Sequence, residues 1–255
     1  MTNQKQSPLA FLSPRLLLVA LNFLTALRLP GAASAGARQL GGAVGFFPLV
    51  GLLLGALLLG AQRLLAAALP APLAAALLLS LWILLSGALH LDGFLDACDG
   101  LFGGRSPEQR LHIMRDEAIG AFAFAGGAIL LLLKFTALQE TAPAALLLAP
   151  TLGRWAMALC IVAFPYARPE GLGSAMKANA DWRQALLASL VAIAAAWFAA
   201  GWLGLLAVGA LLVLVILLGR FVLGLIPGFT GDLYGAACEL GETLVLLIFV
   251  MAIGI

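Results

Sequence analysis

Residues 90–104 read HLDGFLDACDGLFGG and follow directly on an uncharged apolar run at residues 73–89. Residues three or four apart lie on one face of a helix. Asp92, Asp96 and Asp99 therefore form a row of carboxylates along one side of a predicted helix. Like charges this close repel one another unless a cation lies among them, so the row predicts a divalent-metal site. The alternative is a solvated helix end, whose acids favour the positive N-terminus of a following helix.

The composition is typical of a polytopic membrane protein. The 255 residues are 63% hydrophobic and 10% charged, and their mean hydropathy is +1.09. A net charge of only +2 gives no indication of nucleic-acid binding. The three cysteines are an odd number without clustered spacing, which predicts neither a disulfide framework nor a thiolate zinc site. We predict an all-α bundle of membrane helices that forms a single domain over residues 1–255.

About seven membrane spans are predicted after residue 40. They cover residues 41–61, 73–89, 120–138, 144–164, 184–200, 202–218 and a final apolar segment ending at residue 255. The fifth and sixth form a helical hairpin with almost no polar turn. Pro48, inside the first span, predicts a kink or a broken helix.

Residues 1–40 are predicted to form a cytoplasmic or interfacial N-terminal segment. A helix at residues 11–29 carries Arg15 and Arg28 near its ends, and either lies in the interface or adds one more span. Residues 32–35 read AASA, which could pass for a signal-peptidase site. Because arginines interrupt the apolar run before it, we expect the segment to be retained.

The loop charges predict the orientation. Nearly all loop arginines and lysines fall on one side of this topology, and only Arg63 falls on the other. The positive-inside rule makes the crowded side cytoplasmic. All acids except Glu140 lie on that side too, so we predict an inner-membrane protein whose active site faces the cytoplasm.

A second acidic stretch, at residues 228–242, reads GFTGDLYGAACELGE. Asp232 and Glu239 lie on nearly the same helical face, with Glu242 about 60° away. Acids near hydrocarbon and an anionic leaflet are unfavourable, which favours a bound cation over an interfacial helix start. We expect the two acidic stretches to face each other across a cleft and to hold one or two Mg²⁺ ions.

Several basic residues are candidates for contact with substrate phosphates, among them Arg115, Lys177 and Arg183. Each alone also fits a role in topology or in contact with lipid headgroups. Arg154 lies within an apolar span and needs a partner, so it is expected to reach the acidic cleft. Lys134 lies nearer the opposite interface and is expected to snorkel. The role of His90 stays open between ligand, base and interfacial residue.

Metal-bound carboxylates beside arginines indicate transfer of a phosphorus-linked group. Metal and cations neutralise the phosphate charge, while an acceptor hydroxyl is aligned with the leaving group. A spare carboxylate takes the hydroxyl proton.

The sequence resembles the cobalamin synthase family, also called adenosylcobinamide-GDP ribazoletransferase. The likeness starts at residues 89–104 and extends over most of the chain. It includes FFPLVG at 46–51, IMRD at 113–116, IGAF at 119–122, FPYAR at 164–168, GLG at 171–173 and TGD at 230–232, followed by Gly235, Glu239 and Glu242. Two departures stand out. Glu117-Ala118 replaces the Ser-Arg that is common in the family, and Ala26-Leu27 separates Thr25 from Arg28, where the family places the arginine directly after the threonine.

The resemblance implies that adenosylcobinamide-GDP and α-ribazole, or its 5′-phosphate, combine with the help of Mg²⁺. The products are adenosylcobalamin, or its 5′-phosphate, and GMP. The implied metal ligands are Asp92, Asp96, Asp99, Asp232, Glu239 and Glu242. The implied catalytic residues are His90, Asp92, Asp96 and Asp232. The implied substrate contacts are Arg28, Arg115, Asp116, Arg154, Lys177 and Arg183. The partners are then the corrinoid and nucleoside substrates and the lipid bilayer, with a homo-oligomer or a complex with other cobalamin-assembly enzymes left open.

Two other classes of membrane protein fit the sequence less well. A phosphatidyltransferase of the CDP-alcohol class has Ala-Arg after its first Asp-Gly pair, which Phe94-Leu95-Asp96 does not match. A cation transporter would place ionisable groups near the midplane of several spans, whereas here they gather at one face with Arg154 as the main exception.

Overall fold

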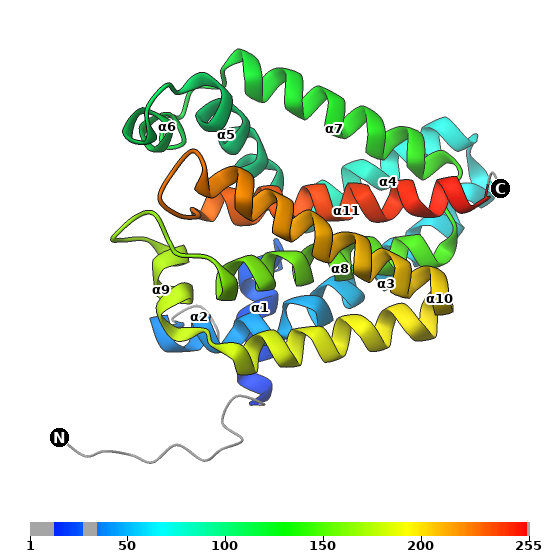
Figure 1. Cartoon of the computed structure of the whole chain (residues 1–255). Helices are drawn as coiled ribbons and strands as arrows, with labels where there is room; N and C mark the ends of the chain where they lie inside the picture. Colours follow the sequence, from blue (N-terminus) through cyan, green and yellow to red (C-terminus); the bar gives the residue numbers. More distant parts are fainter. Residues whose placement is uncertain (1–12, 28–34, 254–255) are drawn as a thin grey trace.

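The computed structural model describes residues 13–27 and 35–253, and these residues form helices joined by short connections (Figure 1). Within these ranges the only β-structure is an isolated bridge between Tyr166 and Phe229. The prediction of an all-α fold is therefore confirmed. The elements are α1 (Pro14–Leu24), α2 (Ala37–Ala43), the 3₁₀ turn η2 (Val44–Phe46), α3 (Phe47–Ala68), α4 (Ala71–Leu85), α5 (Leu89–Gly103), α6 (Pro107–Ile113), α7 (Ala121–Gln139), α8 (Pro143–Ala163), α9 (Leu172–Asn179), α10 (Trp182–Leu223) and α11 (Gly231–Ile253).

The described part of the chain contains five helical segments long and apolar enough to cross a membrane, and a sixth when α4 and α5 are taken as one bent span. One of the five is α10, whose 42 residues fold back on themselves at Gly201. Counting its two arms separately gives the seven spans predicted from the sequence. The chain is thus a multi-pass membrane protein.

The α10 hairpin depends on two glycines. Gly201 has φ 55° and ψ −128°, a conformation that side chains with a Cβ avoid. At Gly204 an added Cβ would lie 2.1 Å from the carbonyl oxygen of Ala196, so the two arms meet backbone to backbone. Trp197 and Trp202 pack edge to face beside the turn, with ring centroids 5.5 Å apart. Figure 1 shows the two arms in yellow and orange, running in opposite directions as predicted.

Helix α8 is the centre of the bundle and is buried along most of its length. Helix α3 packs closely on it at two glycines that leave room for the backbone of α8. A Cβ added at Gly51 would lie 2.2 Å from the carbonyl oxygen of Pro150, and one added at Gly55 would lie 2.6 Å from that of Leu146. Pro48 stands in the first turn of α3, just after η2, where its missing N–H leaves no helical hydrogen bond unmade. The helix is not broken at the proline: a 3₁₀ turn precedes Pro48, and residues 37–68 still form one apolar helical segment.

The predicted span at residues 73–89 is wrong at its C-terminal end. Helix α4 ends at Leu85, Gly87 and Ala88 adopt left-handed backbone angles, and α5 leaves at 90° to α4. At 15 residues α4 is shorter than the roughly 20 residues that cross a bilayer. The backbone N–H of Ala26, just after α1, donates to the carbonyl of Leu85 at 2.8 Å and ties α1 to this break.

Helix α1 has only 11 residues, too few to cross the hydrocarbon core, so the described segment favours the interfacial helix over the extra span. The predicted substrate contact Arg28 and the sequence AASA at residues 32–35 fall wholly or partly outside the described residues. The polar connections that contain α6 and α9, and the connection between α10 and α11, gather at one end of the bundle (Figure 1).

Replacing Gly204 with alanine should separate the arms of α10 and lower the free energy of unfolding by roughly 1–3 kcal/mol. Gly209 lies on the same helix with no atom within 4 Å of an added Cβ, so Gly209→Ala is a matched control that should not destabilise the protein. Thermal unfolding in detergent measures both. Equal losses of stability in the two variants would contradict the close contact.

Candidate active site

The two acidic stretches meet where α5 crosses α11. A Cβ at Gly93 of α5 would lie 2.9 Å from the carbonyl oxygen of Asp232, and a Cβ at Gly235 of α11 would lie 2.9 Å from that of His90. Only glycine permits this backbone approach without displacing a helix. The crossing brings Asp92 and Asp232, far apart in the sequence, to the same place.

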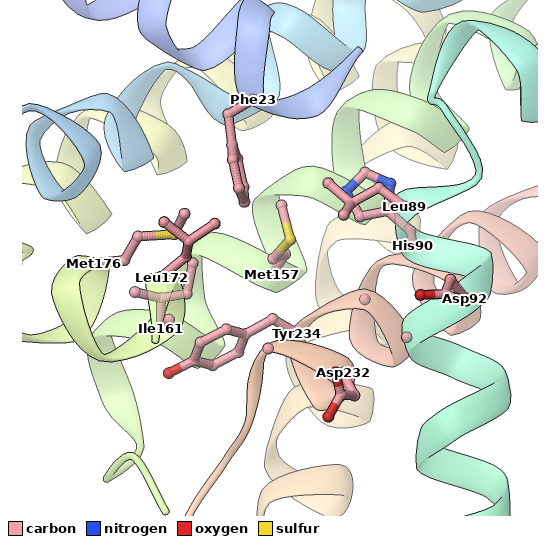
Figure 2. Close-up of a pocket in the computed structure, with 14 residues that line it drawn as sticks. Phe23, Leu89, His90, Asp92, Met157, Ile161, Leu172, Met176, Asp232 and Tyr234 are labelled. Carbon is pink, nitrogen blue, oxygen red and sulfur yellow. The ribbon is translucent and has the colours of Figure 1, made fainter. Parts of the chain in front are cut away.

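A cavity of about 170 Å³ opens beside this crossing. Figure 2 shows Asp92 from α5 and Asp232 from α11 on one side of it, with Leu172 and Met176 from α9 on the other. Phe23 from the end of α1 also lines it. Met157 and Ile161 of α8 complete the lining, so five helices contribute to a single cavity with a polar and an apolar side.

Asp232 is held in a fixed orientation. Its Oδ2 accepts hydrogen bonds from Arg168 Nη2 at 3.0 Å and from Thr230 Oγ1 at 3.2 Å. Both side chains of the Arg168–Asp232 ion pair are partly exposed, so the pair borders the cavity mouth and is not part of the sealed core. Arg168 was quoted from the sequence only as the end of the motif FPYAR, and was not predicted as a site residue.

The loops that carry this pair are locked together. Ala167 N donates to Phe229 O, and Phe229 N donates to Pro165 O, both at 2.8 Å. Phe164 stacks on Phe229 with ring centroids 4.7 Å apart. A Cβ at Gly228 would lie 2.7 Å from Pro165 O, so a glycine is required for this approach. The motifs FPYAR and TGD thus act as one unit that positions Arg168 against Asp232.

Asp92, Asp96 and Asp232 form a cluster that we call the α5–α11 carboxylates. Asp96 is half-buried and lies within electrostatic range of Asp92, Asp232 and Arg168. No group of three or more His, Cys, Asp or Glu side chains in the described ranges is arranged to enclose a metal ion alone. Mg²⁺ needs only one or two carboxylates when water and phosphate oxygens complete its shell, so the donor chemistry here fits that ion.

Asp99 has a different partner from the one predicted. Its Oδ2 accepts from the backbone N–H of Gly120 at 2.6 Å, and its Oδ1 accepts from that of Ala123 at 2.8 Å. These are donors of the first turn of α7, which has no capping side chain of its own. With both oxygens engaged, Asp99 caps α7 and does not serve as a metal ligand in this arrangement.

Glu239 and Glu242 lie in a buried ion cluster with Lys134 and Arg154. Lys134 Nζ donates to both glutamates, at 2.6 Å to Glu242, and Arg154 Nη1 donates to Glu242 at 2.6 Å. All four side chains are less than a tenth exposed. Their charges cancel, so these two glutamates have no unpaired charge for a metal, contrary to the prediction.

The two cations of this cluster, Lys134 and Arg154, are both buried, and neither lines the cavity. The prediction that Lys134 snorkels is wrong, because its ammonium is buried 4.8 Å from the ring centroid of Trp82. Arg154 was predicted to reach the acidic cleft and contact the substrate, but it pairs with Glu242 inside the buried cluster. It is fully buried and also bonds the oxygen of Pro150, so it is a structural residue here and does not face the cavity.

His90 lines the cavity but is only 2% exposed. Neither ring nitrogen has a hydrogen-bond partner among the described residues. Burying an imidazole whose nitrogens have no hydrogen-bond partner is unfavourable unless a ligand or water supplies the hydrogen bonds. His90 is therefore available for contact with a substrate.

The remaining predicted substrate contacts are spread over the loops. Lys177 donates to Val162 O at 2.7 Å at the end of α8, and burial lowers the pKa of its ammonium. Arg183 is exposed and lies over the ring of Trp182. Arg115 and Asp116 are exposed after α6, and Asp116 accepts from Ala118 N at 3.1 Å. Burial is the main cause that raises the phenol pKa of Tyr166, and the charge of Arg115 lowers it slightly, so this arginine lies within electrostatic range of the FPYAR loop.

A sequence model described as cobalamin-5-phosphate synthase matches residues 16–250. The chain belongs to this family. It is similar to adenosylcobinamide-GDP ribazoletransferase from Stutzerimonas stutzeri, with 44% identity over 93% of this chain and 98% of the relative. Proteins of the same name from Desulfitobacterium hafniense (36% identity, 92% and 96% coverage) and Geotalea daltonii (37%, 94% and 98%) are also similar. No solved structure matches the chain.

Membership of the cobalamin-5-phosphate synthase family makes the chain a transferase of cobalamin biosynthesis, as the resemblance implied. It gives no support to the phosphatidyltransferase and transporter alternatives. Three of the family blocks quoted from the sequence, at residues 89–104, 164–168 and 230–232, form the α5–α11 crossing and the locked loops that hold Arg168.

Replacing Lys134 with methionine should leave Glu239 and Glu242 with Arg154 as their one cation. Removing one partner of a buried ion pair costs roughly 3–5 kcal/mol. Thermal unfolding of the purified protein in detergent measures this loss. Adding Glu239→Gln to the variant should recover part of the stability, while Arg63→Met, which removes an exposed cation, should change little. Equal melting temperatures for the Lys134 and Arg63 variants would contradict the cluster.

Proposed function

We propose that the chain joins adenosylcobinamide-GDP to α-ribazole or α-ribazole 5′-phosphate, and forms adenosylcobalamin or its 5′-phosphate together with GMP. The relatives that are similar over nearly the whole chain carry the name of this activity. The structural observation that supports it is the meeting of acids from α5 and α11 beside Arg168. Carboxylates and an arginine at one cavity suit a substrate that carries phosphate groups.

Of the α5–α11 carboxylates, Asp92 and Asp232 would hold Mg²⁺ together with oxygens of the substrate diphosphate, and Asp96 would stay free of metal. When bound, Mg²⁺ would neutralise phosphate charge and favour departure of GMP. Asp99, Glu239 and Glu242 are left out of this set because each already has a structural partner.

The ribose 3′-hydroxyl of the acceptor attacks the phosphorus atom that carries the corrinoid arm. A new O–P bond forms, the P–O bond to GMP breaks, and GMP leaves with the bonding electrons. The hydroxyl proton passes to a carboxylate of the cluster that is free of metal. Asp96 is our choice because it is half-buried and lies within electrostatic range of both Asp92 and Asp232. Arg168 orients Asp232 and can turn toward an arriving phosphate, while His90 donates or accepts one hydrogen bond.

The protein would work in the inner membrane with this cavity toward the cytoplasm. The end of the bundle that holds α6 and α9 carries most of the loop arginines and lysines, which the positive-inside rule assigns to the cytoplasm. A cavity of about 170 Å³ cannot enclose a corrin ring. The ring would stay at the mouth, and only the reacting end of the arm would enter.

Replacing Asp96 with asparagine should lower the rate of GMP release roughly 10²–10⁴-fold, the usual contribution of a general base. The amide keeps the volume of the carboxylate, so the melting temperature should stay close to that of the parent protein. Glu117→Gln, an exposed acid of the loop before α7, is the control and should keep full activity. The assay follows GMP released from adenosylcobinamide-GDP with α-ribazole in reconstituted vesicles. Normal turnover by the Asp96 variant would reject its role.

Chelation of Mg²⁺ should abolish GMP release, and added Mg²⁺ should restore it. Asp92→Asn and Asp232→Asn should raise the Mg²⁺ concentration for half-maximal activity by about tenfold or more, because losing a carboxylate ligand should cost at least as much affinity as losing a partner that supports one. Asp99→Asn and Glu239→Gln should leave this concentration unchanged, because neither side chain is expected to coordinate Mg²⁺. A shift of equal size in all four titrations would contradict the separation of the acids into two groups.

A further inference from the structure

The polar and apolar sides of the cavity belong to different helices. The polar side chains that line it are His90 and Asp92 of α5 and Asp232 and Tyr234 of α11. The facing wall, which we call the apolar wall, consists of five side chains from α1, α8 and α9: Phe23, Met157, Ile161, Leu172 and Met176. No side chain of this wall carries a charge or a hydrogen-bonding group.

We propose that the apolar wall binds the aromatic base of the nucleoside acceptor and selects fused aromatic bases that have few hydrogen-bonding groups. This rests on the proposed function. The ribose attached to that base then points across the cavity to the α5–α11 carboxylates, where its hydroxyl reacts. One cavity thereby positions both halves of the acceptor.

The chemistry of the wall suits a flat aromatic ring. Met157, Ile161 and Met176 are at most 3% exposed, so they present a dry surface. Thioether sulfurs and a phenylalanine ring make favourable contacts with aromatic rings and adapt to their outline. Figure 2 shows Phe23 and Met157 pointing into the same space from α1 and α8.

The other aromatic part of the reaction, the guanine of the donor, fits this wall poorly. Guanine carries a carbonyl, an amino group and ring N–H groups, and burying each without a partner costs about 1–3 kcal/mol. The wall offers no partner for them. A benzimidazole-type base has one free ring nitrogen in its nucleoside, and therefore needs a single partner.

Two buried groups at the border of the wall can supply that partner. The hydroxyl of Tyr234 and the ring nitrogens of His90 have no hydrogen-bond partner among the described residues. Tyr234 is 3% exposed and lies between Ile161 and Asp232 in Figure 2. It stands at the junction between the apolar wall and the reacting carboxylates, where the base joins the ribose.

The test replaces Met157 with glutamine, which keeps the length of the side chain and adds a buried amide to the wall. M157Q should raise KM for α-ribazole about tenfold, the size of a small mismatch in an apolar pocket. KM for adenosylcobinamide-GDP should stay within about twofold of the parent value. M157L keeps the wall apolar and is the matched control, expected to retain both constants. The advantage of a benzimidazole nucleoside over an adenine nucleoside as acceptor should shrink in M157Q.

Equilibrium dialysis of α-ribazole against the reconstituted protein, without the donor, reports on the wall independently of turnover. Weaker binding to M157Q than to M157L supports the proposal whether or not the protein turns over. If the parent protein releases no GMP, only the proposed function is rejected. An increase in KM for the donor with unchanged acceptor binding would overturn the proposal and assign the wall to the donor. M176Q repeats the test from α9 should M157Q fail to fold.

Discussion

The site depends on the backbone contact between α5 and α11. Gly93 and Gly235 let the two helices approach until an added Cβ would lie 2.9 Å from a backbone oxygen of the partner helix. At that spacing Asp92 and Asp232 come together at one cavity, although their charges repel. The locked loops supply the compensating charge, since Arg168 binds Asp232. The glycines, the loops and the arginine therefore act together, and none of them would create the site alone.

Desolvation divides the acids into two groups with different roles. Glu239 and Glu242 face the bundle interior, where an unpaired charge is very unfavourable, and Lys134 and Arg154 neutralise them. The α5–α11 carboxylates keep some exposure, so they are accessible to a substrate or ion. The buried cluster joins α7, α8 and α11 and so holds α11 in register. In this way the structural charges support the reactive ones.

Much of this arrangement follows from the sequence, and the limits have physical causes. The acid spacing, the hairpin around Gly201 and the number of spans are visible as local patterns. The cap that Asp99 provides to α7 depends on Gly120, which is remote in the sequence, so spacing on one helix could not separate Asp99 from Asp92. The end of α4 could not be predicted, because the sequence stays apolar through the break, which is visible only in the backbone angles of Gly87 and Ala88. The burial of Lys134 could not be predicted from its neighbours in the sequence, because its partners Glu239 and Glu242 lie on another helix.

The short helices explain how a bundle of spans becomes an enzyme. Spanning helices alone present side chains to lipid or to each other, and an enzyme needs a cavity that admits its substrate. Helices α1 and α9 are too short to cross and pack across the open end, where Phe23 and Met176 complete the apolar side of the cavity. The break between α4 and α5 turns the acidic helix toward the same place, and the hydrogen bond from Ala26 to Leu85 joins that break to α1. This hydrogen bond joins the end of α1, which carries Phe23, to the break before the acidic helix, so a shift of α1 would move one apolar side chain of the cavity relative to the carboxylates.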